Sequence, residues 1–187
     1  MLIAKTHYQD TAARDIMVTA LSDSFDKLEA DPIFICIGSE HHLLDCLGPL
    51  TGTMLRDKAK DITAFGTLDH PLHAQNLVKE LREIKRMHPG KIEIVIDASV
   101  GEEEEIGLIQ FRQGSLLPGR AYAKNLPAIG HFSITGVVEV RLRDQQAKIN
   151  KRPGLLPVYR LAQLLSESII QWHNEKNRGK GLVTKYW

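Results

Sequence analysis

The sequence predicts an α/β fold in which helices cover both faces of a mostly parallel central sheet, a three-layer α/β/α sandwich. Patterns typical of helices and of strands alternate over residues 11–99. Residues 33–38 are apolar throughout, as is typical of a strand that is covered on both faces. The chain has 187 residues, of which 43% are hydrophobic, enough for one sizeable core. Alternation of this kind favours a parallel sheet with a helical layer on each side.

The first two helices and the first strand are expected near the N-terminus. Residues 11–29 place apolar side chains at helical spacing and predict an amphipathic helix, which Asp31 and Pro32 end. The apolar run 33–38 then predicts a central strand that ends in glycine. Residues 46–59 predict the next helix.

The alternation continues through the middle of the chain. Residues 61–66 predict a second strand, and residues 73–88 an amphipathic helix with alternating charge on its outer side. Residues 91–99 predict a third strand, with Asp97 at its end. This order produces the predicted parallel sheet.

The second half of the chain is less regular. Residues 106–112 and 136–144 predict strands, and residues 157–176 a closing amphipathic helix. A single domain is expected over 1–187, with 177–187 as a flexible or partner-bound tail. The closing helix carries large apolar side chains that would serve a homodimer interface or, more commonly, the core. These are Leu161, Leu164, Leu165 and Trp172.

Composition excludes several classes of protein. The formal net charge of +1 argues against a strongly basic nucleic-acid binder. No apolar run reaches the roughly 18 residues of a membrane span, so no membrane partner is expected. The N-terminus lacks the apolar centre of a signal peptide, and two cysteines do not form a disulfide framework. We therefore expect a cytoplasmic protein.

The residues most able to do chemistry follow the three predicted strands. They are Gly38, Ser39, Glu40 and Asp45 after the first, Asp69, His70 and His73 after the second, and Asp97 at the end of the third. Ligands of open α/β sheets bind at the carboxyl ends of strands, so Asp45 and Asp97 are expected to converge on one crevice. Paired carboxylates can divide the roles of general acid and general base, or hold a divalent cation that activates water.

Other readings of these residues stay open. Asp45 precedes a helix and could simply cap it, and Asp97 could form an ordinary loop. Cys46 at a helix start could be a nucleophile. Gly38 and Ser39 could cradle a phosphate, which would indicate a small-molecule hydrolase or a nucleotide-handling enzyme.

Four segments resemble a known family. They are CIGSEHHLLDCLGPLTG (36–52), FGTLDHPLHAQNL (65–77), IVIDASVG (94–101) and LPGRAYAKNLPAIGHFSITGVVEV (117–140). Together they resemble the YyaC-type sporulation proteins over most of residues 33–140. More distantly, the chain is similar to the germination protease that degrades small acid-soluble spore proteins and to hydrogenase maturation endopeptidases. The resemblance implies a phosphorylase/hydrolase-like fold for the α/β/α sandwich.

The resemblance also implies a function: a spore protease acting on peptides or proteins in the sporulating cell or forespore. Small acid-soluble spore proteins are its implied substrates, and Asp45 and Asp97 its catalytic pair. The aspartates would act directly or through a divalent metal completed by His131, which lies in a stretch comparable to a ligand loop of the maturation enzymes, or by His73. The other polar residues at the strand ends are expected to bind substrate: Gly38, Ser39, Glu40 and Asp69.

The loop after Ser39 departs from the family pattern. Glu40 is followed by bulky residues where the family has an Asp-Arg pair and small polar residues, and the family usually has an acidic residue in place of His131. The alternative is therefore a catalytically inactive sporulation protein that uses the crevice for regulatory binding.

Overall fold

The computed structural model describes residues 1–28, 31–118, 126–140 and 154–183, without the side chains of 179–183. Within these residues one sheet has the strand order β1-β5-β6-β4-β2-β3. Its strands are β1 (Leu2–His7), β2 (Ile33–Cys36), β3 (Ala64–Phe65), β4 (Glu93–Gly101), β5 (Leu108–Gln113) and β6 (Phe132–Val140). The helices are α1 (Ala13–Phe25), α2 (Leu47–Lys58), α3 (Leu77–Met87) and α4 (Leu155–Val183), with short 3-10 turns η1 (Leu43–Asp45) and η2 (Glu103–Glu105).

The sheet is mostly parallel, as predicted. The pairs β3–β2, β2–β4 and β4–β6 are parallel, whereas β5 runs antiparallel to both β6 and β1. All four residues of β2 are buried, with Phe34 and Cys36 in one apolar cluster and Ile33 and Ile35 in another. The alternation of side chains along this central strand therefore supplies a core on each face of the sheet.

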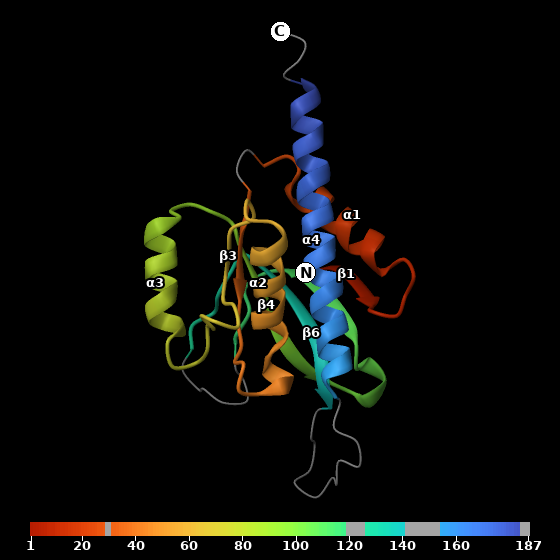
Figure 1. The fold of residues 1–187 in the computed structure, drawn as a ribbon, viewed down its shortest axis with the longest axis vertical. Coiled ribbons are helices and arrows are strands. Elements are labelled where there is room, and N and C mark those ends of the chain that lie inside the picture. The colour runs from red at the N-terminus through yellow and green to blue at the C-terminus, as the bar shows by residue number, and fades with distance from the viewer. Residues whose placement is uncertain (29–30, 119–125, 141–153, 184–187) are drawn as a thin grey trace, which may run out of the picture.

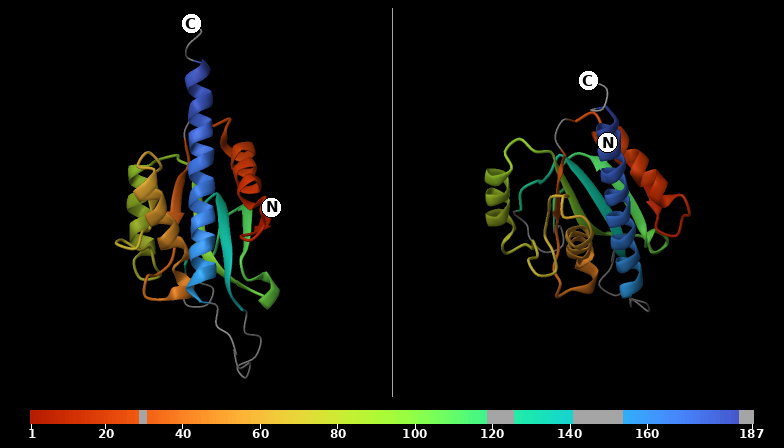
Figure 2. Two further views of the ribbon diagram at one scale, coloured as in Figure 1. Left: turned by 45° about the vertical axis from the view of Figure 1, so that its right-hand side comes forward. Right: turned by 45° about the horizontal axis from the view of Figure 1, so that its top comes forward.

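Helices cover both faces and complete the predicted three layers. Side chains of α1, α2 and α4 form the larger cluster, and those of α3 form the smaller one. Figures 1 and 2 show α1 beside α4, with α3 on the other side of the sheet. On α3 the buried residues are Leu77, Leu81 and Ile84, the spacing of one helical face.

Three elements differ from the sequence prediction. β1 was not predicted, and it pairs with β5 at the edge of the sheet. β4 continues to Gly101, so Asp97 lies inside a strand rather than at its end. α4 continues to Val183, so the start of the predicted tail is helical, and this end projects beyond the sheet (Figure 1). Residues 184–187, like 141–144 of the predicted strand, lie outside the described residues.

The side chains that suggested a dimer belong to the core of one chain. Leu161, Leu165 and Trp172 are buried, and Leu164 packs against the same cluster. The core alternative is therefore correct for these residues, and the homodimer stays a prediction without this support. No helix in the described part of the chain is long and apolar enough to cross a membrane.

A polar cluster holds the second half of α4 to the rest of the domain. The Lys176 ammonium is buried, donates to the Phe25 carbonyl at 3.0 Å and pairs with Asp31 at 2.8 Å. His173 lies 2.7 Å from the Asp61 carboxylate. These contacts lie at the end of the sheet opposite the start of α4.

Asp61→Asn is expected to lower the melting temperature at pH 5, by an amount that shrinks as the pH falls. The hydrogen bond with His173 holds the pKa of Asp61 below its usual value. Such a carboxylate stabilises the fold above its unfolded pKa of about 4, and the contribution is lost as the pH drops through the lower folded value. Thermal unfolding of both proteins between pH 2 and pH 5 measures the change. An unchanging difference would show that the charge plays no part.

Candidate active site at the carboxyl edge of the sheet

Glycines let the start of α2 touch the end of β2. A Cβ atom on Gly48 would lie 2.0 Å from the Ile37 carbonyl oxygen, and one on Gly52 would lie 2.1 Å from that of Gly66. Gly38 has φ +145°, and a Cβ there would lie 2.0 Å from the Asp45 carbonyl oxygen. Only glycine permits such approaches between backbones. The Gly residues of the L-G-P-L-T-G segment therefore fix where Asp45 sits relative to the sheet.

Asp45 ends η1 and is half-buried beside the end of β2. No side chain caps the N-terminus of α2, so the capping alternative is wrong. Burial raises the pKa of Asp45, while the charge of His42, a hydrogen bond from the Ser39 backbone and the charge of His73 oppose this shift. Asp45 is therefore the carboxylate of the site that has partners for its ionised form.

Asp97 lies on β4, one residue beyond the last residue that pairs with β2. It is 7% exposed, and its Oδ1 accepts a hydrogen bond of 2.8 Å from the Ala98 N–H. Burial raises the pKa of Asp97 to about 8, and the nearby charge of Asp45 acts in the same direction. Asp97 therefore keeps its proton at neutral pH.

The structure brings the two predicted aspartates together in one electrostatic environment. The charge on Asp45 adds to the effect of burial in disfavouring ionisation of Asp97, so the proton resides on Asp97, the more buried carboxyl. A protonated and an ionised carboxyl that interact electrostatically can donate one proton and accept another. This is the arrangement required of a general acid and a general base.

His73 reaches this edge through an isolated parallel bridge between Ile37 and Leu72. The Gly38 N–H donates to the Leu72 carbonyl at 2.9 Å, which holds the two loops together. His73 Nδ1 accepts a hydrogen bond of 3.3 Å from the Gln75 N–H. With Nδ1 as acceptor, a neutral His73 carries its proton on Nε2. The charges of His73 and His42 both act on Asp45. His42 was missing from the predicted site.

His131 does not belong to this site. It precedes β6, and both its backbone N–H and its Nδ1 are bonded to the backbone of Glu93, where β4 begins. Glu93 and Asp97 are four residues apart along β4, a distance of about 13 Å. Because β4 and β6 are parallel and in register, His131 lies at the amino edge of the sheet. The predicted ligand set of the two aspartates with His131 is therefore wrong.

The predicted substrate-binding residues separate into two groups. Ser39 is buried at the end of β2, and Glu40 is exposed and pairs with His41 at 3.1 Å, so both stay at the site. Asp69 forms an ion pair with Arg56 at 2.6 Å, in the last turn of α2. The pairing holds Asp69 along α2, away from the helix start where the carboxylates lie.

The structure argues against a phosphate cradle at Gly38 and Ser39 and against Cys46 as a nucleophile. The N–H groups of Gly38 and Ser39 already donate to Leu72 and Asp45, so these groups do not form a phosphate cradle. Cys46 is buried, and burial together with Asp45 and Glu40 raises the pKa of its thiol. This environment disfavours the thiolate that a nucleophile requires.

The residues present do not fit the predicted metal site. Over the part of the chain that the structure describes, no three His, Cys, Asp or Glu side chains gather closely enough to hold a metal ion. A protonated Asp97 is also a poor ligand, because metal ions bind the deprotonated carboxylate. We therefore derive the chemistry of this site from the carboxyl groups themselves.

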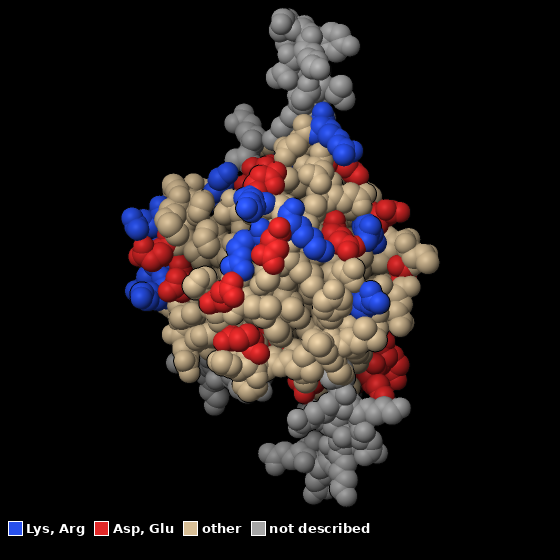
Figure 3. All heavy atoms as spheres, in the orientation of Figure 1, with Lys and Arg blue, Asp and Glu red and all other residues tan. Residues whose placement is uncertain are grey.

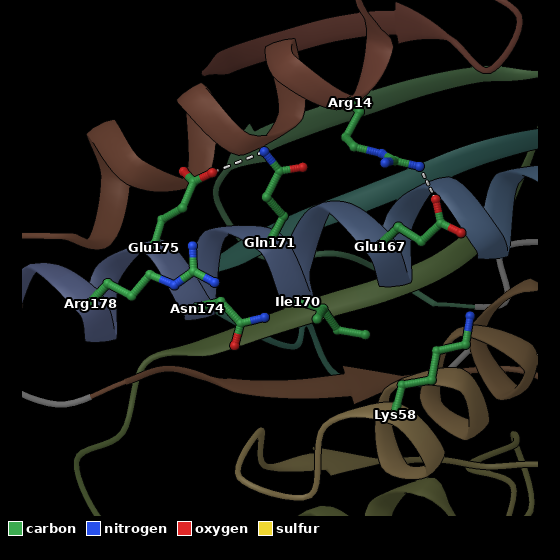
Figure 4. Close-up of a pocket in the computed structure, with 8 residues that line it drawn as sticks. All are labelled: Arg14, Lys58, Glu167, Ile170, Gln171, Asn174, Glu175 and Arg178. Atoms are coloured by element: carbon green, nitrogen blue, oxygen red, sulfur yellow. Dashed lines mark hydrogen bonds and ion pairs between the residues drawn. The ribbon is translucent and has the colours of Figure 1, made fainter.

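A hollow of about 350 Å³ lies elsewhere, along the outer side of α4 (Figure 4). Arg14 pairs there with Glu167, and Gln171 donates to Glu175 at 2.9 Å. Figure 3 shows positive and negative side chains interspersed over the face formed by α2 and α4. Glu167 is about 18 Å along α4 from the start of the helix, so this hollow is separate from the carboxylate pair.

Comparison with known proteins agrees with the predicted family. A family model described as "Protein of unknown function (DUF1256)" matches residues 5–168, which include both aspartates. The "Uncharacterized protein YyaC" of Bacillus subtilis (strain 168) is 33% identical over 179 residues, which is 90% of this chain and 85% of that protein. The chain therefore belongs to the DUF1256 family, among the YyaC-type proteins.

Proposed function

We propose that this protein hydrolyses peptide bonds with Asp45 and Asp97 as its acid–base pair. The observation that carries the proposal is the asymmetry of the pair: a buried Asp97 whose pKa is raised to about 8 beside an Asp45 with partners for its ionised form. Catalytic carboxyl pairs need environments that push their pKa values apart.

The mechanism follows from this proton distribution. Ionised Asp45 takes a proton from water as the water oxygen bonds to the peptide carbonyl carbon, and Asp97 gives its proton to the carbonyl oxygen. In the second step Asp45 returns its proton to the amide nitrogen, the C–N bond breaks, and one hydroxyl of the diol reprotonates Asp97. The products are a carboxylic acid and an amine, and both aspartates regain their starting states.

Apolar side chains beside the pair support a peptide substrate. Leu43 on η1 and Leu155, Leu156 and Tyr159 at the start of α4 are exposed. α4 contacts η1, which places these side chains at the same edge of the sheet as Asp45. They would contact apolar side chains of a polypeptide that lies across the site.

The test uses the full chain and a small acid-soluble spore protein, the substrate class that the family resemblance implies. Mass spectrometry follows cleavage between pH 4 and pH 9. Asp45→Asn and Asp97→Asn are each expected to lower the rate by about 10²–10⁴-fold, because each removes one proton-transfer group. Asp57→Asn, an exposed carboxylate on α2, is the matched control and should leave the rate unchanged.

The pH profile tests the assignment of roles. Activity should fall above about pH 8 as Asp97 loses its proton, and at low pH as Asp45 gains one. Wild-type rates in both Asn variants would overturn the proposal. Absence of cleavage at every pH, with and without added divalent metal, would favour the alternative of a regulatory binding protein.

A further inference from the structure

β1 leaves one side of the sheet without a partner strand in the described structure. It pairs with β5 on one side only. The Tyr8 N–H donates to the Gly107 carbonyl at 3.0 Å, so the alternation of an antiparallel ladder directs the N–H and C=O of Lys5 away from β5. Unpaired backbone groups along a sheet edge are a template for an added strand.

A groove accompanies this edge. A hollow of about 540 Å³ lies between β1 and α1. Ile3 and Ala4 of β1 and Ile16 and Ala20 of α1 give it an apolar lining. Asp15 and Asp23 of α1 line it as well. A strand added beside β1 would therefore place the side chains of one face over α1.

The acidic side chains that line the groove are Asp15 and Asp23 of α1, whereas Lys5 of β1, which also lines it, lies 3.8 Å from the Glu105 carboxylate. Asp15 and Asp23 are exposed, and neither pairs with a cationic side chain among the described residues. Eight residues of helix separate them by about 12 Å. Residues four apart on a strand share a face and are about 13 Å apart. Two basic side chains with this spacing on an added strand match the two carboxylates.

We propose that this groove binds an extended basic segment of a partner protein, which joins the sheet as a strand beside β1. Its Lys or Arg residues at positions i and i+4 pair with Asp15 and Asp23, and the side chain between them covers Ile16 and Ala20. A second copy of this chain fits less well, because a twofold β1–β1 pairing places two acidic α1 helices on the same face of the sheet.

The test measures fluorescence anisotropy of two labelled eight-residue peptides at low ionic strength. The first alternates Thr with Lys or Val so that its two lysines are four positions apart on one face. The second has the same composition, with its lysines three positions apart and hence on opposite faces. The first peptide is expected to bind at least about threefold more tightly, because it can form both ion pairs. Added salt should weaken its binding.

Two variants locate the binding. Asp15→Asn with Asp23→Asn should weaken binding of the first peptide about three- to tenfold. Lys5→Pro should abolish this binding, because proline removes the outward N–H with which an added strand would bond. The fold tolerates this loss, because the Lys5 N–H does not bond to β5. Circular dichroism checks that each variant is folded.

Three outcomes overturn the proposal. The first is no binding of either peptide, and the second is equal binding of both. The third is a dimer in sedimentation experiments that Lys5→Pro dissociates, which would assign the edge to a second copy of the chain.

Discussion

Asp97→Asn is expected to stabilise the fold at pH 8 to 9 while lowering the rate of hydrolysis by about 10²–10⁴-fold. Folding raises the pKa of Asp97 from its ordinary value near 4 to about 8. Between these values the folded protein binds a proton that the unfolded chain does not, so the free energy of unfolding falls as the pH rises from 4 to 8. Asparagine carries no such proton, and its Oδ1 can still accept from the Ala98 N–H.

The gain of the variant should therefore grow with pH and level off above pH 8. Its size is on the order of several kcal/mol, and each kcal/mol raises the melting temperature by roughly 2–4 °C in a domain of this size. Thermal unfolding at pH 4, 6, 8 and 9 measures the difference. Asp57→Asn should show no such gain, and a difference that is constant with pH would mean that Asp97 is ionised in the fold.

Asp45 offers an internal check on this pH dependence. Its charge contributes to the raised pKa of Asp97, so Asp45→Asn should shift the titration of Asp97 to lower pH. In a protein that already carries Asp45→Asn, adding Asp97→Asn should therefore increase the free energy of unfolding over a narrower pH range.

Gly48→Ala is expected to be among the most damaging single substitutions at a glycine of this fold. Helix propensity alone predicts a gain of about 1 kcal/mol from replacing glycine inside α2. The new Cβ would, however, lie 2.0 Å from the Ile37 carbonyl oxygen and 2.7 Å from the Ile37 nitrogen. Both are backbone atoms of a buried segment and cannot rotate away, so we expect a net loss of more than about 3 kcal/mol.

Urea unfolding of Gly48→Ala and Gly154→Ala separates the two effects. A Cβ on Gly154 meets no atom within 4 Å, so that control should change stability by less than about 0.5 kcal/mol. The Gly48 variant should also lose hydrolysis, because α2 carries Asp45 with it. A stabilised Gly48→Ala would show that the helix can move without cost.

The three layers could be predicted because the central strands have a recognisable pattern of apolar residues in the sequence. The run that contains Ile33 and Phe34 is apolar on both faces, and the polar residues after it mark the functional edge. β1 escaped detection because it is short and its exposure alternates only in part, although Ile3 and Thr6 are β-branched residues typical of strands.

The electrostatic interaction of Asp45 with Asp97 could be predicted, whereas the placement of His131 could not. The first depends on the rule that parallel strands end at one edge. The second depends on the register in which Phe132 lies opposite Ile94, a property of two strands that no local pattern encodes. His42 was likewise hidden, because neighbouring histidines give no sign of which one approaches a carboxylate.

The position of β1 in the sheet has a consequence for how the protein emerges from the ribosome. The amino group of Met1 bonds to the Gln113 carbonyl, 112 residues later, and the Trp172 indole donates to Asp26. β1 and the segment around Asp26 are therefore synthesised well before the residues that complete their packing. Such distant partners slow folding and leave an early unit of strand and helix exposed to chaperones during translation.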